Sequence, residues 1–315
     1  MLKSSPDWLI VQGMRRLPLV MIWLFISASV NAQQPRSQNP SPMQETARTH
    51  GRVQEKPWKG LHLILTEPLT KPVDLFLAKE RRRGRLHLLV HFHGAAFVLQ
   101  NALLDMGNDW AGINVQLGSG SRVYEEPFSD PARFRALIAA GQTALGRQLG
   151  VEVRFDRIVL SGFSAGYGAV EAILTDPGNY NQVDAVLLLD GIHASYVPEG
   201  RVLSEGGKIR EEDMRVFTAL ARDAARPDTR KRFVMTHSEI FPGTFVSTTE
   251  ATDYVLQKLP LRRVPVLRWG PRGMQQISEA RRGHFQVLGF AGNTAPDHID
   301  HIHALGHFLK LLLEM

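Results

Sequence analysis

Short apolar runs alternate along this chain with stretches of helical spacing. The runs 86–92 (LHLLVHF) and 183–189 (VDAVLLL) are mostly apolar, as in strands that are covered on both faces of a parallel sheet. After the start signal Ser129-Asp130-Pro131, apolar residues recur every three or four positions to Leu149, as in an amphipathic helix. This alternation predicts an α/β fold, with a mostly parallel central sheet and helices on both faces. Strands are expected at 61–65, 73–78, 86–92, 113–117, 155–160, 183–189, 232–235, 264–269 and 285–290, and helices at 131–149, 211–225, 248–256 and 295–313.

The first 32 residues have the pattern of a secretory signal peptide. Arg15 and Arg16 precede the apolar run 17–30, and Val30-Asn31-Ala32 offers small or modest side chains before a cleavage site near Ala32. Met14, directly before these arginines, is an alternative start. The apolar run is shorter than the roughly 20 residues that span a bilayer, so no stable membrane insertion is expected after cleavage. The pattern therefore predicts a secreted or periplasmic protein.

Residues 33–56 are predicted to form a disordered linker, and residues 57–315 a single domain. The linker is rich in Gln, Pro, Ser and Arg and has no apolar periodicity. The remainder is long enough to bury a large core and contains no second stretch of this composition.

Composition excludes several classes of protein. The chain has no cysteine, which rules out a disulfide framework, a lipoprotein-type anchor and a thiol nucleophile. Its formal charge is +6, and loss of three basic residues and one acidic residue with the signal peptide leaves +4. Basic residues are scattered except in 79–85 (KERRRGR), where no aromatic residue is interleaved. We therefore expect a solvated hairpin turn between the flanking strands and no nucleic-acid partner.

The segment 157–170 (RIVLSGFSAGYGAV) carries the first candidate for chemistry. An apolar, partly β-branched run enters Gly162-Phe163-Ser164-Ala165-Gly166, and the small residues that follow can open a helix. A serine in so sharp a turn has a strained backbone, and small neighbours let the strand and helix pass closely. Ser164 is the predicted nucleophile.

A second set of small residues, His93-Gly94-Ala95-Ala96, follows the strand at 86–92. A carbonyl attacked by Ser164 becomes an oxyanion, which two fixed N–H groups must stabilise. The amide of Ala165, the residue after the serine, is one candidate, and the amide of Ala95 (or Ala96) is the other.

Two carboxylates at strand ends are candidates for the acid of a catalytic triad. Asp190 closes the very apolar strand 183–189, where a charge without an imidazolium partner is unfavourable. Glu239 follows the strand at 232–235. We favour Asp190, which ends the strand directly after the nucleophile helix, and keep Glu239 as the alternative.

The base is expected where the chain enters its last helix, in 297–303 (DHIDHIH). Imidazole both accepts and returns a proton near neutral pH. Thr294 and Asp297 resemble a capping box that puts His298 in the first turn, so His298 is favoured over His301. A metal site is the rival interpretation: His298 and His301 share a helix face, and His93, Asp190 or His237 would complete the ligands. That reading leaves both small-residue turns unexplained, so no metal is expected.

Together these motifs resemble the α/β-hydrolase superfamily: a His-Gly-Ala-Ala turn after the third strand, Gly-Phe-Ser-Ala-Gly at a strand-to-helix turn, then Asp and His. The resemblance covers about residue 61 to the carboxyl terminus. It implies the predicted sheet, a nucleophilic serine and no cofactor. Ala95 stands where esterases and lipases often have a second glycine; alanine keeps the amide but leaves the shape of the loop open.

The resemblance implies a serine hydrolase, and we expect a carboxylesterase that acts by two-step acyl transfer through Ser164, His298 and Asp190. The segments 119–128 and 191–210 are expected to flank its pocket. Export indicates an ester met outside the cytoplasm, either a small molecule or a polymer. A serine peptidase, or a cell-envelope binding protein without activity, remains the alternative.

Overall fold

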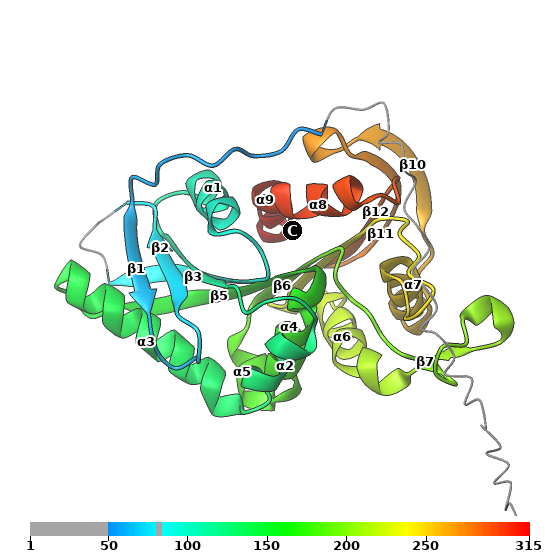
Figure 1. The fold of residues 1–315 in the computed structure, drawn as a ribbon, viewed down its shortest axis with the longest axis horizontal. Helices are drawn as coiled ribbons and strands as arrows, with labels where there is room; N and C mark the ends of the chain where they lie inside the picture. Colours follow the sequence, from blue (N-terminus) through cyan, green and yellow to red (C-terminus); the bar gives the residue numbers. More distant parts are fainter. Residues whose placement is uncertain (1–49, 80–83) are drawn as a thin grey trace, which may run out of the picture. The chain divides into compact units, whose positions relative to one another are not determined.

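A computed structural model describes residues 50–79 and 84–315 of the chain (Figure 1). The predicted signal peptide, and the linker up to residue 49, lie outside the described residues. Residues 50–56 contain no helix or strand, but His50 and Arg52 bond to Asp300 and Val53 packs against the core. The packed part of the chain therefore extends to His50.

A ten-stranded sheet lies at the centre of the described residues (Figure 1). The strands between β4 and β12 pair in parallel, and the pairs toward each edge are antiparallel, which confirms the predicted mostly parallel sheet. The order across the sheet is β1 (Leu61–Leu65), β2 (Val73–Leu77), β4 (Trp110–Val115), β3 (Arg85–Phe92), β5 (Arg154–Phe163), β6 (Ala185–Leu189), β9 (Arg232–His237), β12 (Phe285–Phe290), β11 (Gln275–Arg282) and β10 (Val264–Trp269).

Helices cover both faces of the sheet, as predicted (Figure 1). One face carries α2 (Arg122–Phe128), α3 (Pro131–Leu149), α4 (Tyr167–Thr175), α5 (Pro177–Gln182), α6 (Glu211–Ala224) and α7 (Thr248–Lys258). The other face carries α1 (Ala96–Met106), α8 (Ala295–His303) and α9 (Leu305–Glu314). The chain also forms a small two-stranded ribbon, β7 (Tyr196–Val197) with β8 (Lys208–Ile209), and short 3-10 turns at Ser164–Gly166, Leu203–Glu205 and Pro271–Gly273.

The alternation of side chains along β3 explains why its sequence is apolar throughout. Leu88 and Val90 pack with the helices of one face, whereas Leu89 between them packs with α1 and α9 on the other. All three side chains are fully buried. Since both faces are covered, the strand has no solvent side on which polar residues are favoured.

The predicted hairpin at 79–85 is wrong. Strands β2 and β3 are not neighbours, because β4 lies between them, antiparallel to β2 and parallel to β3. Residues 80–83 themselves are outside the described part. The basic run therefore belongs to a connection between separated strands, and the local sequence carries no signal for that insertion.

The predicted closing helix is two helices. Helix α8 begins with the predicted capping box, in which Thr294 and Asp297 bond reciprocally. It ends at His303, and α9 begins after Ala304. Within residues 50–79 and 84–315, no helix has both the length and the apolar character needed to cross a membrane.

Candidate active site

Ser164 lies in a tight turn at the carboxyl end of β5, between this strand and α4. Its backbone φ angle of 47° is in the left-handed region, which residues other than glycine rarely adopt. A β-carbon on Gly166 would be 2.2 Å from the Phe92 carbonyl oxygen, and one on Gly191 would be 2.4 Å from both Ser164 N and O. The glycines therefore allow the turn, and the turn projects the Ser164 side chain from the sheet edge.

Asp190 and His298 meet at this edge. His298 Nδ1 lies 2.7 Å from Asp190 Oδ2, so the imidazole N–H donates to the carboxylate and Nε2 is left to face away from it. Asp190 follows β6, the neighbour of β5, and His298 lies in the first turn of α8. Of the four pairings that two candidate acids and two candidate bases allow, the structure shows the one between Asp190 and His298.

Two hydroxyl groups complete the surroundings of Asp190, which is 1% exposed. Ser238 donates its amide and its hydroxyl to the carboxylate, at 2.9 and 2.6 Å, and the Thr248 hydroxyl donates at 2.7 Å. Neither residue was identified from the sequence as part of the site. The only hint of Ser238 in the sequence is that it ends the polar run Thr-His-Ser after a strand, and the only hint of Thr248 is that it follows the predicted helix cap Ser247.

The charge of Asp190 is maintained by its neighbours. Burial alone would raise its pKa, but the adjacent His301 and His298 imidazoles, with the hydrogen bonds from His298 and Ser238, hold the pKa of Asp190 well below its usual range. An ionised Asp190 fixes the tautomer of His298 in which Nδ1 carries the proton.

The alternative acid and base lie in different surroundings. Glu239 is exposed, and its Oε2 accepts the backbone N–H of Gly292 at 3.3 Å. His301 is 1% exposed, and its Nδ1 lies 2.8 Å from the hydroxyl of Thr236. Burial lowers the pKa of His301 to about 4, which makes it a poor proton acceptor at neutral pH.

The His298 ring lies over Phe163, the residue before Ser164, with 4.6 Å between the ring centroids. Within the described residues, no hydrogen bond joins Ser164 to His298 in this conformation. Such bonds are often long in free enzymes and tighten when substrate binds.

The two predicted oxyanion donors flank the same edge. Ala95 precedes α1 after β3, and Ala165 follows Ser164 after β5; β3 and β5 are adjacent parallel strands. Ala95 is exposed, and the neighbouring Gly94 N–H donates to Gln116 Oε1 at 2.8 Å. The Ala95 N–H has no hydrogen-bond acceptor within the described part of the chain.

The structure gives no support to the rival metal site. His298 and His301 direct their Nδ1 atoms to Asp190 and Thr236, respectively. Among the described residues, three potential ligand groups come within 4.8 Å of one another only in His50, Asp297 and Asp300. There Asp297 takes part in the α8 capping box, and Arg52 and His50 pair with Asp300.

A cavity of about 590 Å³ opens beside Ser164. It is lined by parts of both segments that the sequence predicted, including Ser121 from 119–128 and Ser195 from 191–210. The tyrosines of those segments have structural roles instead: Tyr124 bonds to His93, and Tyr196 bonds to Glu250.

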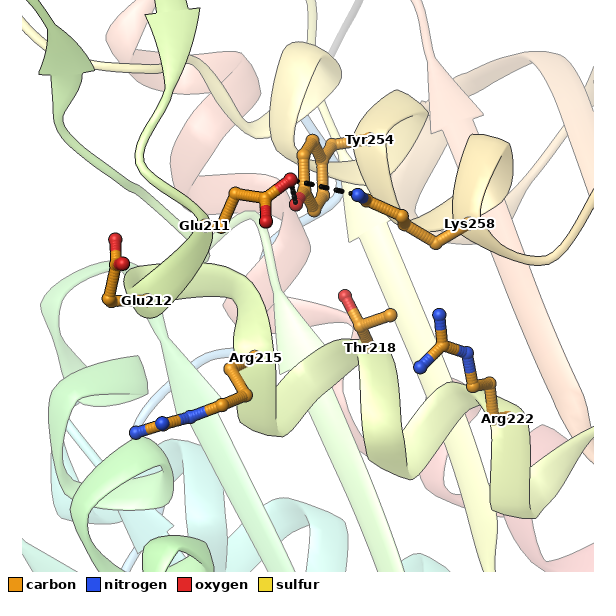
Figure 2. Close-up of a pocket in the computed structure, with 7 residues that line it drawn as sticks. All are labelled: Glu211, Glu212, Arg215, Thr218, Arg222, Tyr254 and Lys258. Atoms are coloured by element: carbon orange, nitrogen blue, oxygen red, sulfur yellow. Dashed lines mark hydrogen bonds and ion pairs between the residues drawn. The ribbon is translucent and has the colours of Figure 1, made fainter.

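A second hollow, of about 270 Å³, lies between α6 and α7 (Figure 2). There Glu211 pairs with Lys258 at 2.9 Å and accepts a hydrogen bond from Tyr254 at 3.2 Å. Figure 2 shows these side chains converging while Glu212 points away from them. The lining of this hollow does not include Ser164.

Buried histidines near the sheet predict a loss of stability in mild acid. Burial lowers the pKa of His91 and His237 to about 3 and that of His301 to about 4, against 6.5 when unfolded. Each therefore contributes stability that is present above pH 6.5 and is lost below it, by about 1.4 kcal/mol per pH unit. Glu171 acts oppositely, because burial raises its pKa to about 8.

On acidification below pH 6.5, the three histidines therefore lower the free energy of unfolding, and Glu171 partly offsets this loss. Urea unfolding should give a free energy of unfolding roughly 3 kcal/mol lower at pH 5.0 than at pH 6.5. An equal free energy of unfolding at both values would show that these histidines are not held neutral in the folded state.

The sheet, its helical layers and the serine turn after β5 define the α/β-hydrolase fold. Solved structures share it at low sequence identity. The enterobactin esterase of Shigella flexneri matches with a TM-score of 0.50 and 11% identity over 84% of this chain and 62% of its own. A siderophore hydrolase of Aspergillus nidulans (TM-score 0.44, 14% identity) is matched over 82% of this chain and 94% of its own. The Pyrococcus horikoshii acylaminoacyl peptidase (TM-score 0.44, 12% identity) is matched over 81% and 42%.

This chain thus spans less than two thirds of the length of the esterase and of the peptidase. No protein-family model matches the sequence, and neither does any curated protein.

Proposed function

We propose that this chain is a secreted serine hydrolase, specifically a carboxylesterase. The observation that carries the proposal is the Asp190–His298 hydrogen bond of 2.7 Å at the sheet edge where Ser164 stands in its strained turn. The arrangement has the order and the roles of a Ser-His-Asp triad. The cavity beside Ser164 supplies space for a substrate. Export is supported by the sequence pattern of residues 1–32.

In the proposed reaction, His298 Nε2 takes the proton of the Ser164 hydroxyl as the oxygen attacks the ester carbonyl. Asp190 is a positioning residue, which holds Nδ1–H and stabilises the imidazolium. The Ala95 and Ala165 amides bind the oxyanion. The tetrahedral intermediate collapses with cleavage of the ester C–O bond, and His298 protonates the departing alcohol.

The second step releases the acyl group. His298 takes a proton from water, whose oxygen attacks the acyl-serine; collapse returns the proton to Ser164 and yields the carboxylic acid. All proton transfers run through His298, so no cofactor is required by the proposed reaction.

A matched pair of substrates tests the reaction class. We expect p-nitrophenyl acetate to be hydrolysed with a kcat/KM at least roughly 100-fold above that of 4-nitroacetanilide, which has the same acyl group and aromatic ring joined by an amide. Equal or faster cleavage of the anilide would favour the peptidase alternative. Hydrolysis of neither, in a folded protein, would favour a binding protein without activity.

A further inference from the structure

The cavity beside Ser164 is lined by three carboxylates and by no lysine or arginine. Glu125 comes from α2, Glu171 from α4 and Asp213 from the first turn of α6. Three separate helices therefore direct acidic side chains to one hollow, which is the one that also contains the proposed nucleophile.

These carboxylates have no basic partner within the described part of the chain. None of the three forms an ion pair with a lysine or arginine, and Asp213 accepts only the backbone N–H of Ser195, at 2.8 Å. Elsewhere the buried Asp300 is paired with Arg52 and His50. Burial, and then the proximity of Asp213 and Glu125, raises the pKa of Glu171 to about 8. Glu171 is therefore mostly protonated at pH 7, and a cation bound beside these groups would favour its ionised form.

The same cavity also has an aromatic wall, formed by Tyr167, His193 and Phe245, which is a separate indication that it binds a cation. The His193 ring lies edge-to-face with Tyr167 at 5.6 Å and with Phe245 at 4.7 Å between centroids. Aromatic faces attract ammonium groups, and best those that shed water readily, such as alkylated ones. Burial lowers the pKa of His193, which keeps this wall uncharged at neutral pH.

We propose, on the basis of the serine-hydrolase function above, that this cavity binds a positively charged alkylammonium group of the ester substrate, held by Glu125, Glu171 and Asp213 against the aromatic wall. The ester carbonyl then lies at Ser164, which lines the same hollow. A bare metal ion fits less well, because the three carboxylates are not a set whose oxygens come within 4.8 Å of one another in the described chain. A volume of about 590 Å³ suits an organic cation.

Acetylcholine and 3,3-dimethylbutyl acetate test this directly, because they have the same skeleton and differ only in a charged nitrogen or a neutral carbon. Wild-type protein is expected to hydrolyse acetylcholine with a kcat/KM at least roughly 10-fold higher. The double variant Glu125→Gln, Glu171→Gln should bring the ratio of the two rates close to one.

The matched control is the double variant Glu126→Gln, Glu212→Gln, which also replaces two carboxyl groups by amides. Glu126 is next to Glu125 in α2, and Glu212 is next to Asp213 in α6, but neither lines this cavity. It should keep the wild-type ratio. A drop of the ratio in both double variants would assign the preference to overall charge and overturn the inference, as would a wild-type ratio of one with p-nitrophenyl acetate still hydrolysed.

Calorimetric titration separates the inference from the proposed reaction. Choline should bind wild-type protein at least roughly 10-fold more tightly than 3,3-dimethylbutan-1-ol. If no ester is hydrolysed while choline binds with this preference, the reaction is refuted and the cation site stands. If esters are hydrolysed and choline binds no better than the neutral alcohol, the cation site is refuted and the reaction stands.

Discussion

Replacing Ser164 by alanine is expected to lower kcat for p-nitrophenyl acetate by at least roughly 10⁴-fold, with KM nearly unchanged. The substitution removes the oxygen that forms the acyl-enzyme, and the proposed oxyanion donors and the cavity remain. Alanine leaves the backbone of the turn, at φ 47°, no more strained than serine does, so the fold should persist. Initial rates and the circular dichroism of the variant measure both effects.

Ser161→Ala is the matched control within the same segment. Ser161 is fully buried in β5, and its hydroxyl has no hydrogen-bond partner among the described residues. Its removal should leave kcat within about 2-fold. If Ser164→Ala retained wild-type hydrolysis, the nucleophile would have to be another group and the proposed mechanism would be wrong.

Asp190→Asn is expected to lower kcat roughly 10³- to 10⁴-fold. The amide cannot stabilise an imidazolium, and its NH₂ group would face donors, because Asp190 accepts from His298, Ser238 and Thr248. The same mismatch should lower the free energy of unfolding by about 2–4 kcal/mol, since a buried hydrogen-bonded network is broken. Steady-state kinetics and urea unfolding measure the two losses separately.

Glu239→Gln is the control for the choice of acid. Glu239 is exposed and contacts the backbone of Gly292, so its substitution should change kcat by less than about 3-fold. A larger rate loss for Glu239→Gln than for Asp190→Asn would reverse the assignment of the two carboxylates.

The sequence predicted the limits of several strands, whether or not both of their faces are buried. The predicted limits agree for β12, which is buried throughout, and for the edge strands β1 and β10, which are partly exposed. Strand β11 was not predicted: its sequence, QQISEARR, buries Gln276 and Ala280 and lacks the apolar alternation that marks a strand. Sheet order was also beyond local patterns, as the insertion of β4 between β2 and β3 shows.

The residues of the candidate site also differ in how far local sequence could predict them. Ser164, Ala95 and Ala165 stand in turns whose small residues are visible in the sequence. The pairing of Asp190 with His298 spans 108 positions, and the bonds from Ser238 and Thr248 to Asp190 span 48 and 58. Contacts between residues so far apart in the sequence depend on which strand ends lie side by side in the fold. The sequence could therefore identify Asp190 and Glu239 as candidate acids but could not decide which of them pairs with His298. The acidic lining of the cavity, drawn from three helices, was invisible for the same reason.

Covalent labelling with diisopropyl fluorophosphate tests the central claim, that Ser164 is an activated nucleophile, most directly. The serine oxygen displaces fluoride from phosphorus, and mass spectrometry of the digested chain locates the adduct. We expect one adduct per chain, on Ser164, with loss of esterase activity in proportion and no adduct in Ser164→Ala. Complete inactivation with the adduct on another residue, or an unlabelled Ser164 in an enzyme that hydrolyses p-nitrophenyl acetate, would contradict the account.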